Sequence, residues 1–312
     1  MKPEVLVLTR IYAPTLAALE QAYTVHRLWS APDPQAALRE PGRNVRAVVT
    51  TSLAGLSGQQ LALLPRLEIV ACMGIGHRAI DLAAARERGI AVTITPTPID
   101  HAVADLGVGL MIAVMRRICE TDRFVRAGRW THRLPPLGAD LSGKVCGVVG
   151  LGAIGGAIAS RARAFGMSVC YYGPREKSGV PYRYYRDLEA LAAAADCLVV
   201  TCAATDATRN LVDMRVLEAL GSRGFLVNVA RGAIVDETAL VSALANGRIA
   251  GAGLDVYWDE PHVPQGLLDL DNVVLVPHIG SSTMEIREQR GAHVLASLEA
   301  HFAGRAVPNR VE

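Results

Sequence analysis

Polar side chains follow two apolar, strand-like runs in the second half of the sequence. Arg231 lies in the segment NVARG, and His278 lies in the segment PHIG. Between them, GLDVYWDEP carries Asp255 and Glu260. The planar guanidinium of an arginine matches a carboxylate. A histidine beside a carboxylate is stabilised as imidazolium and then serves as a proton donor near neutral pH. These residue types indicate acid catalysis on a ligand that carries a carboxylate.

Each of these side chains also has a purely structural interpretation when it is taken alone. Arg231 fits the cap of a sheet edge, Glu260 fits a solvated acid before a proline, and His278 fits a loop histidine with satisfied hydrogen bonds. Their positions after strands favour the catalytic interpretation, because ligands of doubly wound sheets bind beyond the carboxyl ends of the strands.

A glycine-rich turn in mid-chain indicates a phosphate-binding site. The segment GLGAIG follows the apolar run Val145–Val149 and precedes a helical pattern, and this context is typical of a dinucleotide-binding turn. The first glycine permits the tight turn, the second lets backbone N–H groups approach a pyrophosphate, and the third lets helix and strand pack closely. A strand–helix turn without a ligand is the structural alternative. The predicted cofactor contacts in this turn are Gly150, Gly152, Ala153, Ile154 and Gly155.

The end of the next strand indicates which dinucleotide is bound. An acidic residue normally stands there, binds the adenosine ribose and repels a 2′-phosphate, whereas this chain has Gly173, followed by Arg175 and Lys177. Both bases reach toward a 2′-phosphate, although Glu176 offers either of them a partner and a solvated turn is the structural alternative. The segment predicts that NADP(H) is preferred and that NAD(H) is possible.

The elements that must position these residues alternate between strand and helix. Near-continuous apolar runs predict strands buried on both faces, as in parallel sheets, and the helical patterns between them indicate βαβ units. We expect an α/β fold of two Rossmann-like, doubly wound parallel-sheet domains with the active site in the cleft between them. The predicted strands are Val5–Leu8, Ala47–Thr50, Glu68–Ala71, Val145–Val149, Ser168–Tyr172, Cys197–Thr201, Phe225–Val229, Gly251–Leu254 and Val273–Val276.

The position of the glycine turn determines the expected domain boundaries. A dinucleotide-binding fold begins at its first strand, here Val145, so a separate α/β domain precedes it. We expect a discontinuous substrate-binding domain from residues 1–99 and 285–312, and a dinucleotide-binding domain from residues 100–284. The segment His101–Ala127 contains no proline and is expected to form one long helix that crosses between the domains.

Composition narrows the class of protein. The chain has 312 residues, of which 51% are hydrophobic and 20% are charged, and its formal net charge is +2. This balance argues against nucleic acid or a membrane as the main partner. The six cysteines form no CxxC pair, so we expect buried free thiols and no metal site. With no signal peptide or transmembrane run apparent, a cytoplasmic protein is expected.

These motifs, in this order, resemble the D-isomer-specific 2-hydroxyacid dehydrogenases over nearly the whole chain. The resemblance rests on GLGAIG, NVARG, the Asp-x-x-x-x-Glu-Pro stretch, PHIG and the earlier segment GIGHRAIDLAAARERGIAV. Within that family, YYGPREK, TCAATDATRN and GAGLDVYWDEPHVP look most like the NADPH-dependent hydroxypyruvate, glyoxylate and hydroxyphenylpyruvate reductases. The chain departs from those relatives in Gly173–Pro174 and in Asp105, which stands where the family commonly has glutamate.

The resemblance implies a role for each site residue. Arg231, Glu260 and His278 correspond to the family's catalytic residues. Asp255 corresponds to the residue that binds the nicotinamide amide. The backbone of the loop Met73-Gly74-Ile75-Gly76 corresponds to the site of the substrate carboxylate, which Arg231 also contacts. His278 is expected to contact the substrate at the oxygen that receives the proton. Cys202 and Ala230 complete the expected cofactor contacts.

The implied function is an NAD(P)H-dependent reductase that converts small 2-oxo acids, such as glyoxylate, hydroxypyruvate or an aryl-pyruvate, into D-2-hydroxy acids. Two alternatives remain: a phosphite- or formate-type dehydrogenase of the same fold, and a non-catalytic NAD(P)-sensing module like a corepressor. The resemblance also implies a homodimer built from the cofactor domains. Trp130 and Trp258 are expected to shape the pocket or to pack in a core or interface.

Overall fold

The chain folds as two compact units, which a computed structural model describes over residues 2–311. The first unit combines the residues up to Pro98 with those from Thr283 onward, and the second is the continuous segment Ile99–Ser282. Among the described residues, no helix is both long enough and apolar enough to cross a membrane.

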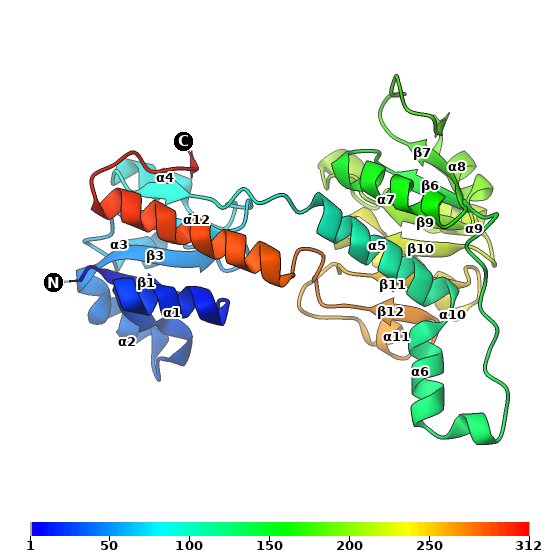
Figure 1. Cartoon of the computed structure of the whole chain (residues 1–312), viewed down its shortest axis with the longest axis horizontal. Helices are drawn as coiled ribbons and strands as arrows, with labels where there is room; N and C mark the ends of the chain where they lie inside the picture. The colour runs from blue at the N-terminus through cyan, green and yellow to red at the C-terminus, as the bar shows by residue number, and fades with distance from the viewer. Residues whose placement is uncertain (1, 312) are drawn as a thin grey trace. The chain divides into compact units, whose positions relative to one another are not determined.

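The first unit, which Figure 1 draws in blue to cyan and in orange to red, is built on a sheet of six strands within residues 2–311. Their order is β13-β5-β4-β3-β1-β2. All neighbours are parallel except β13, which pairs with β5 in the antiparallel direction. Its elements are β1 (Glu4–Val7), α1 (Ala13–Ala22), β2 (Thr24–Arg27), α2 (Pro34–Arg39), β3 (Val45–Thr51), α3 (Gly58–Ala62), β4 (Ile69–Met73), α4 (Leu82–Glu87), β5 (Ala91–Thr93), α12 (Met284–Phe302) and β13 (Arg310–Val311).

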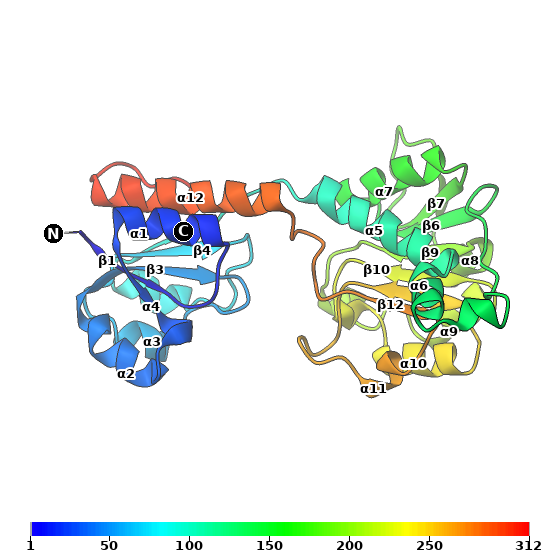
Figure 2. The ribbon, with the colours of Figure 1, turned by 60° about the horizontal axis from the view of Figure 1, so that its bottom comes forward.

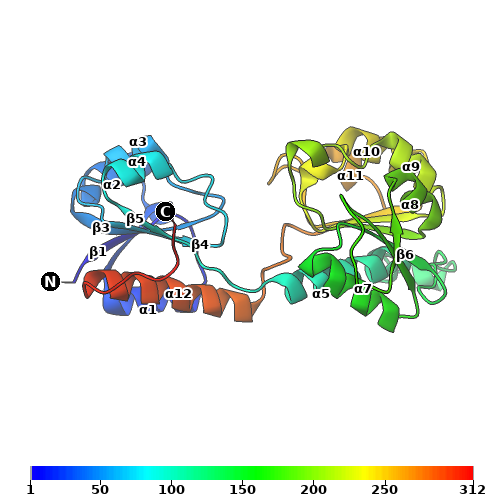
Figure 3. The ribbon, with the colours of Figure 1, turned by 90° about the horizontal axis from the view of Figure 1, so that it is seen from above.

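Helices cover both faces of this first sheet. Helices α1 and α12 lie side by side on one face, and α3 and α4 lie on the other (Figures 2 and 3). The last long helix therefore belongs to the first unit: α12 packs on β4, and its Val294 and Leu298 are buried in one hydrophobic cluster with Ile69 of that strand. The side chain of Thr283 caps this helix by accepting a hydrogen bond from the N–H of Ile286.

The second unit is built on a fully parallel sheet of seven strands within the described chain, in the order β12-β11-β10-β9-β6-β7-β8. The strand order reverses between β6 and β9, which is the point where doubly wound sheets bind dinucleotides. Its elements are α5 (Asp100–Met115), α6 (Ile118–Arg126), β6 (Val145–Val149), α7 (Ala153–Ala164), β7 (Ser168–Tyr172), β8 (Arg183–Tyr185), α8 (Leu188–Ala194), β9 (Cys197–Val200), α9 (Met214–Leu220), β10 (Phe225–Asn228), α10 (Glu237–Ala245), β11 (Gly251–Leu254), α11 (Gln265–Leu268) and β12 (Val273–Leu275).

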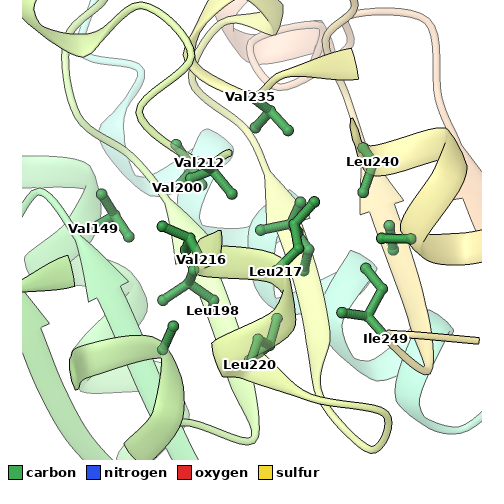
Figure 4. Close-up of a cluster of buried hydrophobic side chains, with 14 of the residues drawn as sticks. Val149, Leu198, Val200, Val212, Val216, Leu217, Leu220, Val235, Leu240 and Ile249 are labelled. Atoms are coloured by element: carbon green, nitrogen blue, oxygen red, sulfur yellow. The ribbon is translucent and has the colours of Figure 1, made fainter. Parts of the chain in front are cut away.

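The second sheet has a hydrophobic core on each face. On one face, α8, α9 and α10 bury the cluster drawn in Figure 4 against the central strands. On the other face lie α5 and α7 (Figure 3). These two helices approach closely because Gly107 has no side chain: a Cβ there would lie 2.9 Å from Cδ1 of Ile158.

The expectation of a single helix over His101–Ala127 is wrong. Helix α5 ends at Met115, Arg117 adopts a left-handed φ of 54°, and α6 starts at Ile118. The returning chain explains the break, because the N–H of Ala139 donates to the carbonyl of Met115 at 2.7 Å. Gly138 packs against the same helix end, where a Cβ would lie 2.9 Å from Cα of Arg116.

Candidate active site

The turn between β6 and α7 is shaped by glycines that no larger residue could replace without displacing the backbone. Gly150 has a φ of +96°, and a Cβ there would lie 2.7 Å from the backbone nitrogen of Cys202. A Cβ on Gly155 would lie 2.3 Å from the carbonyl oxygen of Gly150. The first and third glycines of the motif therefore set the turn and the helix–strand packing that the sequence pattern predicts.

The N-terminus of α7 fits a phosphate group. Its N-cap residue is Gly152, and no side chain caps the helix. The first N–H groups of a helix have no intrahelical acceptor, and they point outward together with the positive end of the helix dipole. A Cβ on Gly152 would meet nothing within 4 Å, so the space above the turn is open. Gly152, Ala153, Ile154 and Gly155 thus lie where a pyrophosphate would be held.

Cys202 borders this turn from the end of β9. Burial raises the pKa of its thiol to about 11, so the group is neutral at physiological pH. Nearby, Thr201 donates from its hydroxyl to the carbonyl of Gly150 at 2.6 Å. The two strand ends at the reversal of strand order are therefore bonded to each other beside the phosphate site.

The end of β7 carries the residues that the sequence assigns to cofactor selection. The hydroxyl of Tyr184 donates to the carbonyl of Gly173 at 3.1 Å, and the hydroxyl of Tyr171 accepts from the N–H of Lys177 at 2.8 Å. These bonds fix the turn, while the side chains of Arg175 and Lys177 are exposed. Within residues 2–311 neither base forms an ion pair with Glu176, so both side chains are available to bind an external anion.

Arg231 lies after β10 in a turn that a neighbouring amide holds. Asn228 accepts from the N–H of Ala230 through Oδ1 at 3.0 Å and donates through Nδ2 to the carbonyl of Arg231 at 3.1 Å. The next residue, Gly232, packs directly on the segment after β11, because a Cβ there would lie 2.0 Å from the carbonyl oxygen of Tyr257. The Arg231 side chain is exposed, and its Nη1 donates to the carbonyl of Ala230 at 2.6 Å.

Glu260 and His278 form a close pair. Oε2 of Glu260 lies 2.6 Å from Nδ1 of His278. The other carboxylate oxygen, Oε1, accepts from the N–H of Tyr257 at 3.1 Å. The hydroxyl of Tyr257 donates to the carbonyl of Val276 at 3.0 Å, and this bond ties the Glu260 segment to the end of β12. With Nδ1 taken by the carboxylate, Nε2 of His278 is the ring nitrogen left to face a substrate.

Asp255 contacts the histidine loop. Its oxygens Oδ1 and Oδ2 accept from the N–H groups of Ile279 and Gly280 at 2.6 and 2.9 Å. The pKa of this carboxyl is raised, because the effect of burial outweighs that of the two N–H donors, which lower it. Asp255 is therefore next to the pair formed by Glu260 and His278, and each of its carboxylate oxygens accepts one hydrogen bond from the loop.

The loop Met73–Gly76 follows β4 in the first unit. Gly74 has a φ of +133°, its N–H donates to Oγ1 of Thr95 at 2.7 Å, and its carbonyl accepts from the N–H of Thr95. Met73 is buried, whereas Ile75 and Gly76 are exposed. Ser52 packs beneath the loop, since a Cβ on Gly74 would lie 2.3 Å from its hydroxyl oxygen. The N–H groups of Ile75 and Gly76 have no acceptor in the described chain, so they are the donors available for an anion.

Sequence reasoning missed the residues that support these side chains. Thr95 and Ser52 hold the Met73–Gly76 loop from distant positions in the sequence. The support by Asn228 is local, since its partners Ala230 and Arg231 lie two and three residues on. The structure also explains the shortened acid Asp105, which pairs with Arg161 of α7 at 2.7 Å and so joins α5 to α7.

Comparison with known proteins identifies the class to which this fold and site belong. Residues 108–280 match the sequence model of the D-isomer specific 2-hydroxyacid dehydrogenase, NAD binding domain. Glyoxylate/hydroxypyruvate reductase A of Arabidopsis thaliana is 45% identical over 93% of this chain and 92% of its own length. The hydroxyphenylpyruvate reductase of Plectranthus scutellarioides is 43% identical over 92% of each chain.

A solved structure agrees over the full length. The NADPH-dependent glyoxylate/hydroxypyruvate reductase of Sinorhizobium meliloti, in complex with citrate, is 37% identical, with a TM-score of 0.85 and coverage of 99% of this chain and 98% of that one. The chain therefore belongs to the D-isomer-specific 2-hydroxyacid dehydrogenase family. It is an oxidoreductase with a nicotinamide cofactor, as the sequence predicted.

Proposed function

We propose that this protein reduces small 2-oxo acids, with glyoxylate, hydroxypyruvate and hydroxyphenylpyruvate as the candidate substrates, to D-2-hydroxy acids. The pair formed by Glu260 and His278 at 2.6 Å carries the proposal, because it is a ready proton donor in the same unit as the glycine turn and Arg231. The names of the relatives support this class of substrate, since those proteins are reductases of glyoxylate, hydroxypyruvate and hydroxyphenylpyruvate.

In this proposal, the residues of the chain bind the acid and move one proton. In the second unit, the guanidinium of Arg231 binds the substrate carboxylate and polarises the carbonyl. In the first unit, the N–H groups of Ile75 and Gly76 are available to bind an anion. The reduced nicotinamide, when bound, supplies the hydride. Nε2 of His278 gives its proton to the oxygen of the new hydroxyl group, and Glu260 stabilises the imidazolium before that transfer.

We propose NADPH as the preferred cofactor and NADH as a poorer one. Gly173 places no negative charge at the end of β7, and the exposed Arg175 and Lys177 lack an internal partner in residues 2–311. A 2′-phosphate would find two cations there and no carboxylate at position 173, where a family acid would repel it. The NADPH-dependent relative from Sinorhizobium meliloti supports this choice.

We further propose that the protein is a homodimer. The segment after α6 exposes large apolar side chains, with Trp130 66%, Leu134 88% and Leu137 90% exposed. Apolar groups gathered in this way favour a protein partner, and light scattering of Leu134→Lys should show monomers where the native chain shows dimers.

The function is tested by following NADPH absorbance with each of the three oxo acids. We expect turnover with at least one of them and none without an oxo acid. Binding of NADPH without turnover would instead indicate a sensing module. Reduction of NADP⁺ or NAD⁺ by phosphite or formate, with no activity on oxo acids, would indicate the other type of dehydrogenase.

A further inference from the structure

Strand β8 ends beside the turn that carries Gly173. Strands β7 and β8 are parallel, and their last residues, Tyr172 and Tyr185, are register partners. The next residues along the chain, Gly173 and Arg186, therefore leave the sheet at the same edge, from neighbouring strands that lie about 5 Å apart. Arg186 could not be identified from the sequence alone, because the strand that places it was not predicted.

Two contacts of Tyr184 hold the end of β8 against this turn. Its hydroxyl donates to the carbonyl of Gly173 at 3.1 Å. Its ring packs on the buried ring of Tyr171, with the two centroids 5.3 Å apart. Because Tyr184 lies only two residues before Arg186 in the chain, these contacts fix the backbone that carries Arg186 beside the end of β7.

The charges at this edge favour an anion. The side chain of Arg186 is exposed, and within residues 2–311 it forms no ion pair or hydrogen bond. The adjacent carboxylate of Asp187 caps α8, where it accepts from the N–H of Ala190 at 2.8 Å. The positive side chains at this edge outnumber the carboxylates, with Arg175, Lys177 and Arg186 against Glu176 and Asp187.

We propose that Arg186 is a third cation of the site for the adenosine 2′-phosphate, and that it contributes to the preference for NADPH from a second strand. This inference rests on the proposed cofactor preference. A phosphate group offers three acceptor oxygens, and a guanidinium matches two of them at once. Arg175 and Arg186 approach the group from the ends of β7 and β8. A ribose hydroxyl carries no charge, so Arg186 adds little to the binding of NADH.

Calorimetry with two nucleotides tests the proposal. Adenosine 2′,5′-bisphosphate carries the 2′-phosphate, and 5′-AMP is the same nucleotide without it. Arg186→Ala should raise Kd for the bisphosphate about threefold to fivefold, near the upper end for a solvent-exposed pair of charges, and should leave Kd for 5′-AMP unchanged. The effect should shrink as the salt concentration is raised, because exposed charges are screened.

Arg183→Ala is the matched control. Arg183 is an exposed arginine of the same strand, but its register partner is Cys170, well before the end of β7. Its guanidinium carbon lies over the ring of Tyr185, 4.8 Å from the centroid. This variant loses the same charge and should leave both Kd values unchanged.

Two further variants at position 186 separate charge from shape. Arg186→Lys keeps the charge without the planar fork, so its Kd for the bisphosphate should lie between those of the native protein and Arg186→Ala. Arg186→Glu should weaken that binding more than Arg186→Ala does, because attraction becomes repulsion.

The outcomes distinguish this inference from the proposals on which it rests. Equal Kd of the native protein and Arg186→Ala for the bisphosphate would overturn the role of Arg186 and leave the preference to the turn after β7. Equal weakening of both nucleotides would also overturn it. A native protein that binds both nucleotides equally would overturn the cofactor preference, and this inference with it. Binding is measured without an oxo acid, so discrimination by a protein that reduces none would count only against the proposed reaction.

Discussion

The double variant Gly173→Asp with Arg175→Ala should invert the cofactor preference. The aspartate adds an acceptor for the ribose hydroxyls and a charge that repels a 2′-phosphate, and the alanine removes the fork that binds the phosphate. The structure accommodates the new side chain: a Cβ on Gly173 meets only the carbonyl oxygen of Arg175, at 4.0 Å, and its φ lies outside the left-handed region. Tyr184 keeps its bond to the Gly173 carbonyl, which is a backbone group.

The size of the native preference follows from one exposed contact. A hydrogen bond between charged groups contributes roughly 1.5–3 kcal/mol, and about 1.4 kcal/mol corresponds to a factor of ten. Arg175 and Lys177 are exposed, so solvent and salt reduce the attraction. We therefore expect the native enzyme to prefer NADPH by about tenfold, near the lower end of that range.

The assay compares kcat/KM for NADPH and NADH in the native enzyme and the double variant at one ionic strength. Arg223→Ala is the control for a general loss of positive charge, because Arg223 is also exposed but precedes β10, at the opposite end of the strands from the cofactor turn. It should leave the ratio unchanged. A native enzyme that prefers NADH would refute the reasoning, and would mean that Arg175 and Lys177 point to solvent.

Four further outcomes are expected. His278→Ala should lower kcat at pH 7 by roughly two to four orders of magnitude with NADPH binding unchanged; near-normal turnover would remove its role as proton donor. Glu260→Gln should lower kcat with NADPH binding unchanged, because Nδ1 of His278 loses the carboxylate that lies 2.6 Å away; unchanged turnover would separate the two residues. Arg231→Lys should raise KM and lower kcat together, and unchanged kinetics would leave Arg231 as a structural cap. Burial raises the pKa of Cys146 from 9.0 to about 12, so above pH 9 the unfolded chain ionises first and the free energy of unfolding falls by about 1.4 kcal/mol per pH unit from this thiol; urea unfolding of Cys146→Ala should show a shallower decline.

Most of the central strands could be predicted from the sequence, because strands buried on both faces are near-continuous apolar runs. Strands β6, β7 and β11 have the predicted bounds, and β1, β3, β4, β9, β10 and β12 differ by only a few residues. The missed strands are short or lie at edges: β5 has three buried residues between β4 and β13, β2 and β8 carry polar residues in partly exposed positions, and β13 has two residues. Edge pairing depends on neighbours and not on an apolar run.

The site was predictable where chemistry is local and was missed where it is supplied from a distance. The glycine motif, Arg231 and His278 follow strands directly, so their positions could be inferred from sequence. The bond between Thr95 and Gly74 joins residues of no recognisable pattern. The break after Met115 likewise depends on Ala139, which a reading of helical propensity in residues 101–127 does not consider.

The insertion of the second unit into the first has a consequence for biosynthesis. The segment Ile99–Ser282 is continuous, so all of its strands leave the ribosome before the first unit is complete. The first unit lacks α12, and with it the buried Val294 and Leu298 side chains, until the whole second unit has been synthesised. Domains usually fold in the order of their synthesis, but here the second unit is complete in sequence before the first, whose sheet has α1 but not yet α12 on one face. A nascent chain halted before Thr283 should hold a folded nucleotide site beside an unfinished first unit.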